Sequence, residues 1–311
     1  MLLSLFYIVI FPGFIFLSVY GCMVEYMDRK LYARFQNRIG PPWCQPFADF
    51  IKLIGKEAII PEKADKAMFR ILPAFALASA SATILYIPLW STGALFSFKS
   101  DLIVVLYLLT IPTITFFIAG WSSTSLYSTL GSIRTLTQLF AYEVPLYMAL
   151  LGPALLAGTW SISEIATFYY ENPLLALCNI PGFIVAIIAL QGKLERVPFD
   201  TPEAETEIVA GSFTEYSGRY LALFRMTIDI EMLVLVSLIG AIFFPVYFPG
   251  NTVLGVITYF LKTIILVFIL ALVRSLMARL RIEQMVKFCW KYLAPAAIFQ
   301  ILIDVLVKGA L

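Results

Sequence analysis

The stretch that decides the fold is the apolar run near the start of the chain, LLSLFYIVIFPGFIFLSVYGCMV, which covers residues 2–24. It contains no charged side chain, and about 20 apolar residues are enough to cross the hydrocarbon core of a bilayer as a helix. The run also lacks the basic segment that opens a secretory signal peptide, so we expect no cleavable leader here. We therefore predict that residues 2–24 form the first membrane-spanning helix.

The composition of the whole chain agrees with this interpretation. Hydrophobic residues make up 61% of the sequence and charged residues 14%, whereas soluble domains are about half apolar and a quarter charged. Histidine is absent, and the four cysteines lie far apart without a CxxC spacing. These counts argue against a haem, zinc or iron–sulfur site held by this chain. We expect an integral membrane protein that binds no cofactor itself and has lipid, not nucleic acid, around it.

Seven further apolar runs follow the first, and each is long enough to span as a helix. The eight predicted spans are 2–24, 72–92, 102–121, 135–158, 174–193, 226–249, 253–276 and 290–309. No internal repeat or low-complexity linker divides them. We predict an all-α polytopic protein in which residues 1–311 form a single membrane domain.

The basic residues give the orientation of these spans. Only Lys99, Lys262 and Lys308, of 22 Lys and Arg in total, fall outside the connections that follow spans 1, 3, 5 and 7. Because loops rich in Lys and Arg stay in the cytoplasm, these connections are predicted to be cytoplasmic. The N- and C-termini are then expected on the outer side of a cell membrane.

The first cytoplasmic connection contains two patterned segments. In DRKLYARFQNRIGPPW, residues 28–43, basic side chains recur every four residues and would form one helical face until Gly-Pro-Pro stops the helix. The residues of this face are Lys30, Arg34 and Arg38. The next segment, residues 45–63, places Phe47, Phe50, Ile51 and Ile54 on one face, which predicts an amphipathic helix at the membrane surface or under a partner.

Several acidic residues fall inside predicted spans or at their ends. Glu143 lies within span 4, where a charge is costly unless it is paired, hydrated or neutralised. Burial raises the pKa of a carboxyl group, so such a residue is a candidate to take up and release protons, the alternative being a structural hydrogen bond to a neighbouring helix. Asp229 and Glu231 open span 6 and are separated by one residue, so they do not both face lipid comfortably. Asp304, near the end of span 8, is either a functional acid or a polar residue at the outer interface.

The most acidic segment is RVPFDTPEAETEIVAGSFTEYSG, residues 196–218. Its candidate proton-relay residues are Asp200, Glu203, Glu205, Glu207 and Glu215, and Arg196 is a candidate to balance their charge. Pro202 suits the first turn of a helix, which would put Glu203 and Glu207 on one face, where like charges repel. Two other interpretations remain: a solvated acidic loop, and an acidic patch that docks a basic soluble subunit.

These motifs resemble a known family. The acidic segment, the DRKLYARFQNRIGP stretch with QPFADFIKLIGKE, and AYEVPLYMALLG at residues 141–152 are similar to a membrane subunit of complex I, the one named H in bacteria and 1 in mitochondria. The resemblance covers essentially the full chain. The family includes the corresponding subunits of membrane-bound [NiFe] hydrogenases and of archaeal sulfane sulfur reductases.

The resemblance implies a coupling role without a redox centre in this chain. Soluble iron–sulfur and catalytic subunits, with NiFe in some complexes, would dock on the cytoplasmic face, and antiporter-like membrane subunits would move the ions. The acidic loop would then lie beside the redox site, and Glu143 would be the first relay acid within the membrane. Asp229 and Glu231 would replace acids that quinone-type members of the family hold nearby. The resemblance also implies that the basic residues Arg29, Lys30, Arg34 and Arg38 balance the charge or dock the soluble arm.

Two departures favour the hydrogenase or sulfur reductase type over the quinone type. The segment RIGPPWCQP is shorter than the corresponding segment of quinone-type members. Arg225 and Ile228 also depart from the quinone-type pattern, which has a Glu at the position of Ile228. The quinone-binding subunit of an NADH:quinone-type oxidoreductase is the nearest alternative. A stand-alone cation-coupled transporter is an alternative of another class, although it would be expected to show inverted repeats. The terminal electron acceptor and the pumped ion, H⁺ or Na⁺, are left open.

Overall fold

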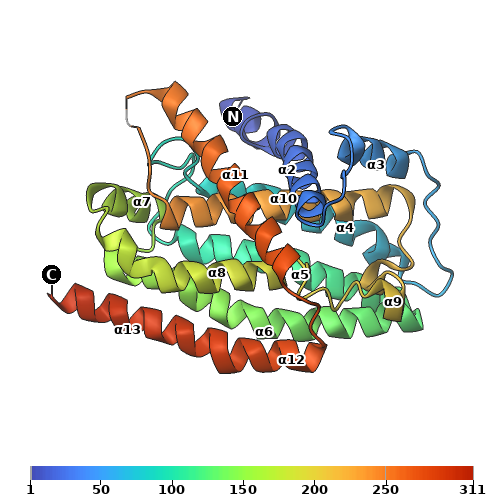
Figure 1. Ribbon diagram of the computed structural model, residues 1–311. Helices are drawn as coiled ribbons and strands as arrows, with labels where there is room; N and C mark the ends of the chain where they lie inside the picture. The colour runs from blue at the N-terminus through green and yellow to red at the C-terminus, as the bar shows by residue number, and fades with distance from the viewer. Residues whose placement is uncertain (1, 249, 311) are drawn as a thin grey trace.

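Eight helical segments are long and apolar enough to cross a membrane in the computed structural model, which describes residues 2–248 and 250–310 (Figure 1). The segments are Phe6–Phe35, Lys66–Tyr86, Asp101–Ser122, Leu126–Ala157, Leu175–Lys193, Gly218–Phe243, Thr252–Leu276 and Ile282–Gly309. The predicted number of spans and the all-α polytopic fold class are therefore confirmed.

Thirteen α-helices make up these segments and their connections within the described residues. They are α1 (Leu2–Val9), α2 (Phe14–Phe35), α3 (Gln45–Ile54), α4 (Lys66–Thr83), α5 (Asp101–Ser122), α6 (Leu126–Ala157), α7 (Ile162–Glu171), α8 (Ile180–Lys193), α9 (Glu205–Ile208), α10 (Gly218–Phe243), α11 (Thr252–Leu276), α12 (Ile282–Phe288) and α13 (Ala294–Ala310). A π-helical turn, Cys289–Leu293, joins α12 to α13.

The first predicted span is not one uninterrupted helix. The chain breaks between α1 and α2, at Pro12 and Gly13. A proline has no amide hydrogen to donate, and its ring clashes with the carbonyl four residues earlier, so the helix ends before it. The continuous part then extends to Phe35, well beyond the predicted end at residue 24.

Several other spans begin earlier than predicted, at their polar ends. The fourth begins at Leu126 instead of residue 135, and the sixth at Gly218 instead of 226. Hydropathy detects only the apolar part of a helix, whereas backbone hydrogen bonding continues into the polar turns beside it. The result for α6 is an unbroken helix of 32 residues that passes through Pro145 and Pro153.

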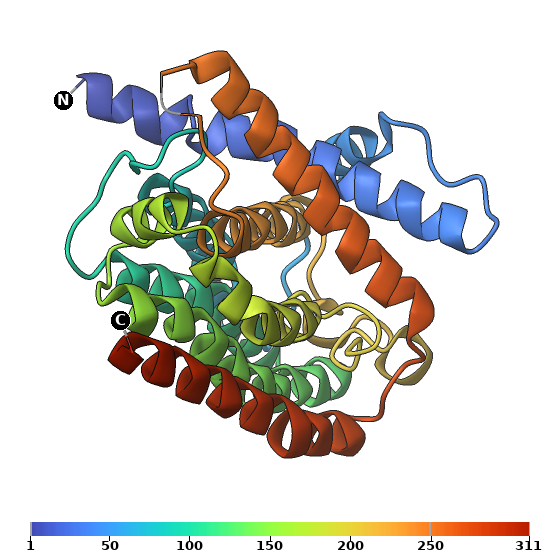
Figure 2. The same cartoon turned by 60° about the vertical axis from the view of Figure 1, so that its left-hand side comes forward.

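Helix α10 is the central element of the bundle. It packs against α2, α3, α4, α7, α8 and α11, and every residue from Ile230 to Phe243 is buried. Figure 2 shows α10 enclosed by the other helices, with α13 along the outer edge. Polar side chains on α10 are therefore surrounded by protein instead of lipid.

The connections predicted to be cytoplasmic gather at one end of the bundle. Figure 2 shows the two chain ends at one end, and the loops 36–44 and 194–204 at the opposite end. Helix α3 forms in the segment where an amphipathic helix was predicted; Phe47 and Phe50 pack on the core, while Ile51 and Ile54 are exposed. This loop-bearing end holds the candidate site.

Candidate functional site

A cavity of about 740 Å³ lies at the loop-bearing end of the bundle. Its walls come from α2, α3, α10 and the loop 194–204, with the end of α11 beside them. More than half of the lining residues are charged, and the acids among them are Glu25, Asp49, Glu195, Asp200, Glu203, Asp229 and Glu231. Because most of its lining residues are charged, the cavity is suited to hold water and ions.

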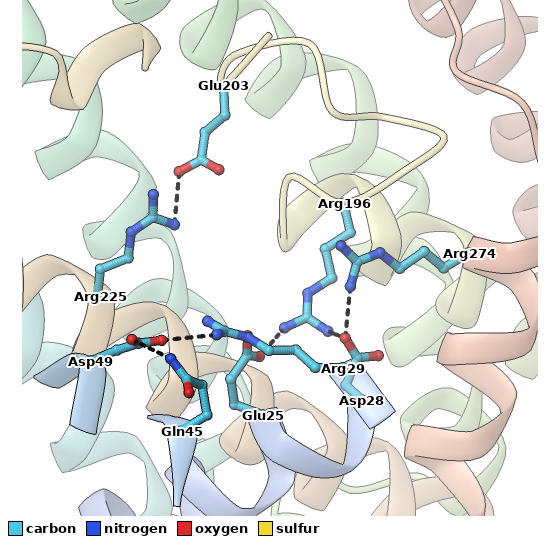
Figure 3. A network of polar contacts seen from close by, with 9 residues as sticks. All are labelled: Glu25, Asp28, Arg29, Gln45, Asp49, Arg196, Glu203, Arg225 and Arg274. Atoms are coloured by element: carbon cyan, nitrogen blue, oxygen red, sulfur yellow. Dashed lines mark hydrogen bonds and ion pairs between the residues drawn. The ribbon is translucent and has the colours of Figure 1, made fainter. Parts of the chain in front are cut away.

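Arg196 is the centre of the ion pairs in this cavity (Figure 3). Its side chain is 9% exposed, and its two terminal nitrogens reach Glu25 Oε2 at 2.6 Å and Asp28 Oδ2 at 2.5 Å. Arg274, from the end of α11, lies 2.8 Å from the same Asp28 oxygen. The loop 194–204 is thereby tied to α2 and α11 by charges that water does not screen.

A second set of polar contacts joins α2 to α3. Arg29 Nε lies 2.6 Å from Glu25 Oε1, and its Nη1 lies 3.2 Å from Asp49 Oδ2. Gln45 Nε2 donates a hydrogen bond to the other oxygen of Asp49, at 2.8 Å. Arg29 and Asp49 are each about two-fifths exposed, so these contacts orient α3 more than they stabilise the fold.

The acidic loop contributes Glu203 to the opposite wall. Its Oε1 lies 3.2 Å from Arg225 Nη1, at the start of α10 (Figure 3). Behind this wall, Thr201 donates a 2.5 Å hydrogen bond to Gln138 Oε1, and Gln138 Nε2 donates to the carbonyl of Gly192 at 2.7 Å. These bonds attach the loop to α6 and to the end of α8.

Close backbone contacts at two glycines hold the residues around Gly211 against α6. A Cβ atom on Gly131 would lie 2.5 Å from backbone atoms of Gly211 and Ser212, and one on Gly211 would overlap the carbonyl oxygen of Pro202. Ser128 donates a hydrogen bond to the carbonyl of Ser212 at 3.0 Å. The acidic segment is therefore held against α6 by direct backbone packing.

At its inner end the cavity reaches a buried ion pair. Lys193 Nζ, from the last residue of α8, lies 2.9 Å from Glu231 Oε1 on α10, and the two side chains are 3% and 2% exposed. Asp229, two residues earlier on α10, also lines the cavity. Sequence reasoning singled out both acids but not the lysine.

Glu143 lies beyond this end, on α6. It is half-buried and accepts a 2.7 Å hydrogen bond from the hydroxyl of Tyr147. The same hydroxyl lies 3.1 Å from the carbonyl oxygen of Leu106 on α5. Glu143 does not line the cavity, so the structure separates it from the acids of the loop.

The acids of the loop that were predicted to form one relay lie in different places in the structure. Asp200 and Glu203 line the cavity, whereas Glu207 is exposed and pairs with Arg134 at 2.6 Å, and Glu215 lies in the turn before α10. The side chain of Glu205 lies outside the described residues. The arginine beside Glu207 holds the pKa of its carboxyl below the usual value.

The predicted helix beginning at Pro202 is wrong. Helix α9 contains only Glu205–Ile208, so Glu203 precedes it and does not share a helical face with Glu207. The physical reason is that tertiary contacts hold Thr201 and Pro202 in a non-helical path, through the bond to Gln138 and the contact with Gly211. Tertiary contacts override the local helix signal here.

The predicted basic face of the first loop is only partly present. Arg29 lines the cavity, and Lys30 donates a 3.4 Å hydrogen bond to the carbonyl of Pro41. Arg34 and Arg38 are exposed, and Arg38 lies beyond the end of α2 at Phe35, so it does not continue the face. The helix stops five residues before the Gly-Pro-Pro motif that was expected to stop it.

Sequence reasoning missed five residues of the site. They are Glu25, Asp28, Asp49, Lys193 and Glu195. A usable signal existed for Glu25, since an acid placed four residues before Arg29 forms an ion pair on a helix. The contacts of Asp28 and Lys193 join segments far apart in sequence and leave no local signal.

Glu195 is a carboxyl of the cavity whose protonation depends on the fold. Its Oε1 is enclosed, with no hydrogen-bond partner among the described residues. Burial raises the pKa of Glu195 well above its usual value, and the charges of Glu203, Glu231 and Asp200 raise it further. The folded protein thus favours the protonated form of this group.

This shift predicts a pH-dependent effect of replacing Glu195 by glutamine. A raised pKa in the folded state contributes stability below the unfolded value of about 4.3, and that contribution is lost as pH rises through the folded value. We expect Glu195→Gln to melt above the wild type at pH 8, with the difference shrinking toward pH 4. Melting curves of the detergent-solubilised complex measure it, and a pH-independent difference would contradict the assignment.

One further acid lies at the opposite end of the bundle. Asp304 on α13 is fully buried and accepts hydrogen bonds of 2.8 and 3.0 Å from Gln300 Nε2. It packs on Gly152 of α6, where a Cβ atom would lie 2.6 Å from Asp304 Oδ2. Asp304 is therefore enclosed by protein, and its assignment as a functional acid or as a polar residue near the outer interface stays a prediction.

Comparison with known proteins agrees with this architecture. A family model described as NADH dehydrogenase matches residues 6–305. The H chain of the NADH-quinone oxidoreductase of Brevibacillus brevis is 36% identical over 296 residues, covering 91% of this chain and 87% of that protein. Subunit 8 of the Thermus thermophilus NADH-quinone oxidoreductase is 35% identical over 294 residues, covering 90% and 80%.

A solved structure has the same fold. A chain of the membrane-bound sulfane sulfur reductase, described as an archaeal respiratory membrane complex, superposes with a TM-score of 0.82. The identity is 26%, and the match covers 93% of this chain and 96% of the other.

Proposed function

The chain belongs to the NADH dehydrogenase family and is the H-type subunit of a complex I-like membrane complex, and from this premise we propose that it relays protonation changes from the cytoplasmic cavity into the membrane. Electron transfer occurs in soluble partner subunits docked over the loops. Ion movement occurs in membrane partners beside this chain. The chain connects the two through titratable side chains.

The observation that supports this proposal is the course of the charged cavity. It begins among the loop residues Asp200 and Glu203 and ends at the buried Lys193–Glu231 pair on α8 and α10. A route lined with charges admits water and protons, whereas the apolar helices around it exclude them. Glu143 then acts as the next proton acceptor within the membrane.

Docking and location follow from the same distribution of charge. We propose that the soluble iron–sulfur and catalytic subunits, including NiFe where present, sit on the loop-bearing end, where Arg34 and Arg38 are exposed. The antiporter-like subunits contact the apolar outer helices. The chain lies in the cell membrane with both termini outside, as the positive-inside distribution predicts.

Within this family we favour the sulfur reductase or hydrogenase type. Arg225 and Ile228, at positions where the quinone-type pattern differs, both line the cavity, and Arg225 pairs with Glu203. A charged wall disfavours an apolar quinone tail. The quinone-binding function is the second candidate, supported by the relatives from NADH-quinone oxidoreductases.

Replacing Glu143 by glutamine tests the relay. The complex is purified with this chain in place and reconstituted into liposomes, with reduced methyl viologen as electron donor and a pH-sensitive dye inside. Because an amide does not carry a proton, we expect Glu143→Gln to lower the protons moved per electron by about tenfold or more.

The matched control is Glu207→Gln. Glu207 is exposed and lies outside the cavity, so this change is expected to leave the proton-to-electron ratio near that of the wild type. A Glu143→Gln complex that moves protons normally would overturn the relay proposal.

Acceptor dependence separates the two family types. The same reconstituted complex is offered protons, polysulfide or a short-chain quinone as acceptor. Turnover without quinone, unaffected by a quinone-site inhibitor, supports the sulfur reductase or hydrogenase type. Strict dependence on quinone supports the second candidate.

A further inference from the structure

The Lys193–Glu231 pair is isolated from water on almost every side. Its two charged groups approach within 2.9 Å, and both side chains are at least nine-tenths buried. The cavity described above reaches both of them. A buried pair of this kind is weak evidence for stability, because the cost of removing two charges from water offsets their attraction. Its position next to a charged cavity therefore points to function.

The lysine is held in place independently of the carboxylate. Its Nζ donates to the carbonyl oxygen of Leu109 at 2.7 Å and to the hydroxyl of Thr113 at 3.3 Å, both on α5. Glu231 Oε1 lies 2.9 Å from the same Nζ. Because Leu109 and Thr113 also hold the ammonium, protonating Glu231 would still leave Lys193 two partners on α5.

A hydroxyl chain leads away from the lysine toward α6. The Thr113 hydroxyl lies 3.3 Å from the hydroxyl of Tyr142, and Lys193 Nζ lies 5.8 Å from the centre of the Tyr142 ring. Tyr142 immediately precedes Glu143 in the sequence. The cavity, the Lys193–Glu231 pair and the Thr113 and Tyr142 hydroxyls thus follow one another in the order in which a proton from the cavity would reach them.

The other titratable groups around the pair are acids and phenols. Glu195 from the loop and Tyr142 from α6 interact electrostatically with Glu231. Tyr147 interacts electrostatically with both Glu231 and Glu143. Asp229 lines the cavity on the same helix as Glu231. Lys193 is the cation nearest to Glu231 among the described residues.

Resting on the proposed relay, we propose that Lys193 is itself a proton carrier within the membrane, exchanging protons with Glu231 on one side and with the Thr113–Tyr142 hydroxyls on the other. A cavity proton joins the Glu231 carboxylate. The ammonium of Lys193 has then lost its counter-ion and passes one proton to the hydroxyl pair and on toward Glu143. The Glu231 proton next crosses to the Lys193 amine, which restores the ion pair. One proton enters and one leaves in each cycle.

Lys193→Arg tests the proton transfer itself. Arginine keeps the positive charge but does not deprotonate in proteins, so it can hold Glu231 without carrying a proton. We expect this complex to assemble and oxidise viologen, while the protons moved per electron fall by about tenfold or more. Normal translocation by Lys193→Arg would overturn the proposal, because a fixed charge would then suffice.

A double replacement covers the case in which arginine does not fit. Lys193→Met with Glu231→Leu removes both charges and fills their volume with apolar atoms, a change that buried pairs often tolerate. We expect the double variant to melt near the wild type and to lose translocation, whereas each single variant melts lower. A double variant that translocates normally would show the pair to be structural, which also overturns the proposal.

Two comparisons make the outcomes distinguishable. Lys99→Met removes an exposed lysine elsewhere and controls for the loss of a positive charge. Glu143→Gln reports on the relay as a whole. Loss of translocation in Glu143→Gln with normal translocation in Lys193→Arg rejects the lysine as carrier and leaves the relay standing, whereas normal translocation in both rejects the relay.

Discussion

Replacing Arg196 by glutamine is expected to destabilise the folded chain by about 3–5 kcal/mol, because it leaves buried carboxylates without their cation. Arg196 pairs with Glu25 and Asp28, whose side chains are 10% and 1% exposed. Asp28 retains Arg274 at 2.8 Å, but Glu25 then depends on the half-exposed Arg29. The loop 194–204 also loses its attachment to α2.

The effect is measured as the melting temperature of the solubilised complex. A second substitution, which removes one of the unpaired carboxylate charges, tests whether stability is restored. Arg196→Gln combined with Glu25→Gln removes part of the unpaired charge, and we expect it to recover part of the lost stability. Arg196→Lys keeps the charge but cannot reach both acids with two nitrogens, so its melting temperature should fall between those of the wild type and Arg196→Gln. A change of less than about 1 kcal/mol for Arg196→Gln would contradict the role given to this arginine.

Replacing Gly131 by alanine is expected to have a comparable effect through a different mechanism. The new Cβ would lie 2.5 Å from backbone atoms of Gly211 and Ser212, closer than any real contact allows. Since backbone and not a flexible side chain fills the space, the acidic segment must move off α6. Overpacking of this kind costs about 1–3 kcal/mol. Here it also displaces Gly211 and, through their close contact, Pro202, which lies behind the cavity wall.

Two readouts separate displacement of the loop from general damage. Gly93→Ala is the matched control, because no atom lies within 4 Å of the added Cβ and the residue is exposed. We expect Gly131→Ala to melt lower and to expose the loop 194–217 to limited proteolysis, while Gly93→Ala does neither. Unchanged proteolysis in Gly131→Ala would mean that the segment is not seated on α6 by this contact.

The spans were predictable from sequence because their signal is local and strong. Hydropathy alone identified eight of them, and the errors arose where helical structure leaves the apolar core, as at Leu126 and Gly218. The break at Pro12 was also readable, since proline interrupts a helix for reasons contained within one turn. Sequence patterning thus located the bundle, with errors confined to the ends of its helices.

The site was only partly predictable because its decisive contacts are not local. Asp229 and Glu231 stood out as acids in an apolar setting, and both line the cavity. Lys193 looked like an ordinary basic residue at the end of a span, and nothing in the sequence brings it to Glu231, 38 residues later. The prediction that Glu203 and Glu207 share a helical face was wrong, because a bond from Thr201 to α6 decides the path of that loop.

The unbroken helix α6 has a consequence for how signals cross this protein. Thirty-two residues at 1.5 Å each make a rod of about 48 Å, longer than the hydrocarbon layer is thick. One end carries the loop through Gly131 and Gln138, and the other supports Asp304 through Gly152. Because one continuous helix carries both contacts, a tilt of α6 caused by a shift of the loop at one surface would also move the residues around Asp304 near the opposite leaflet.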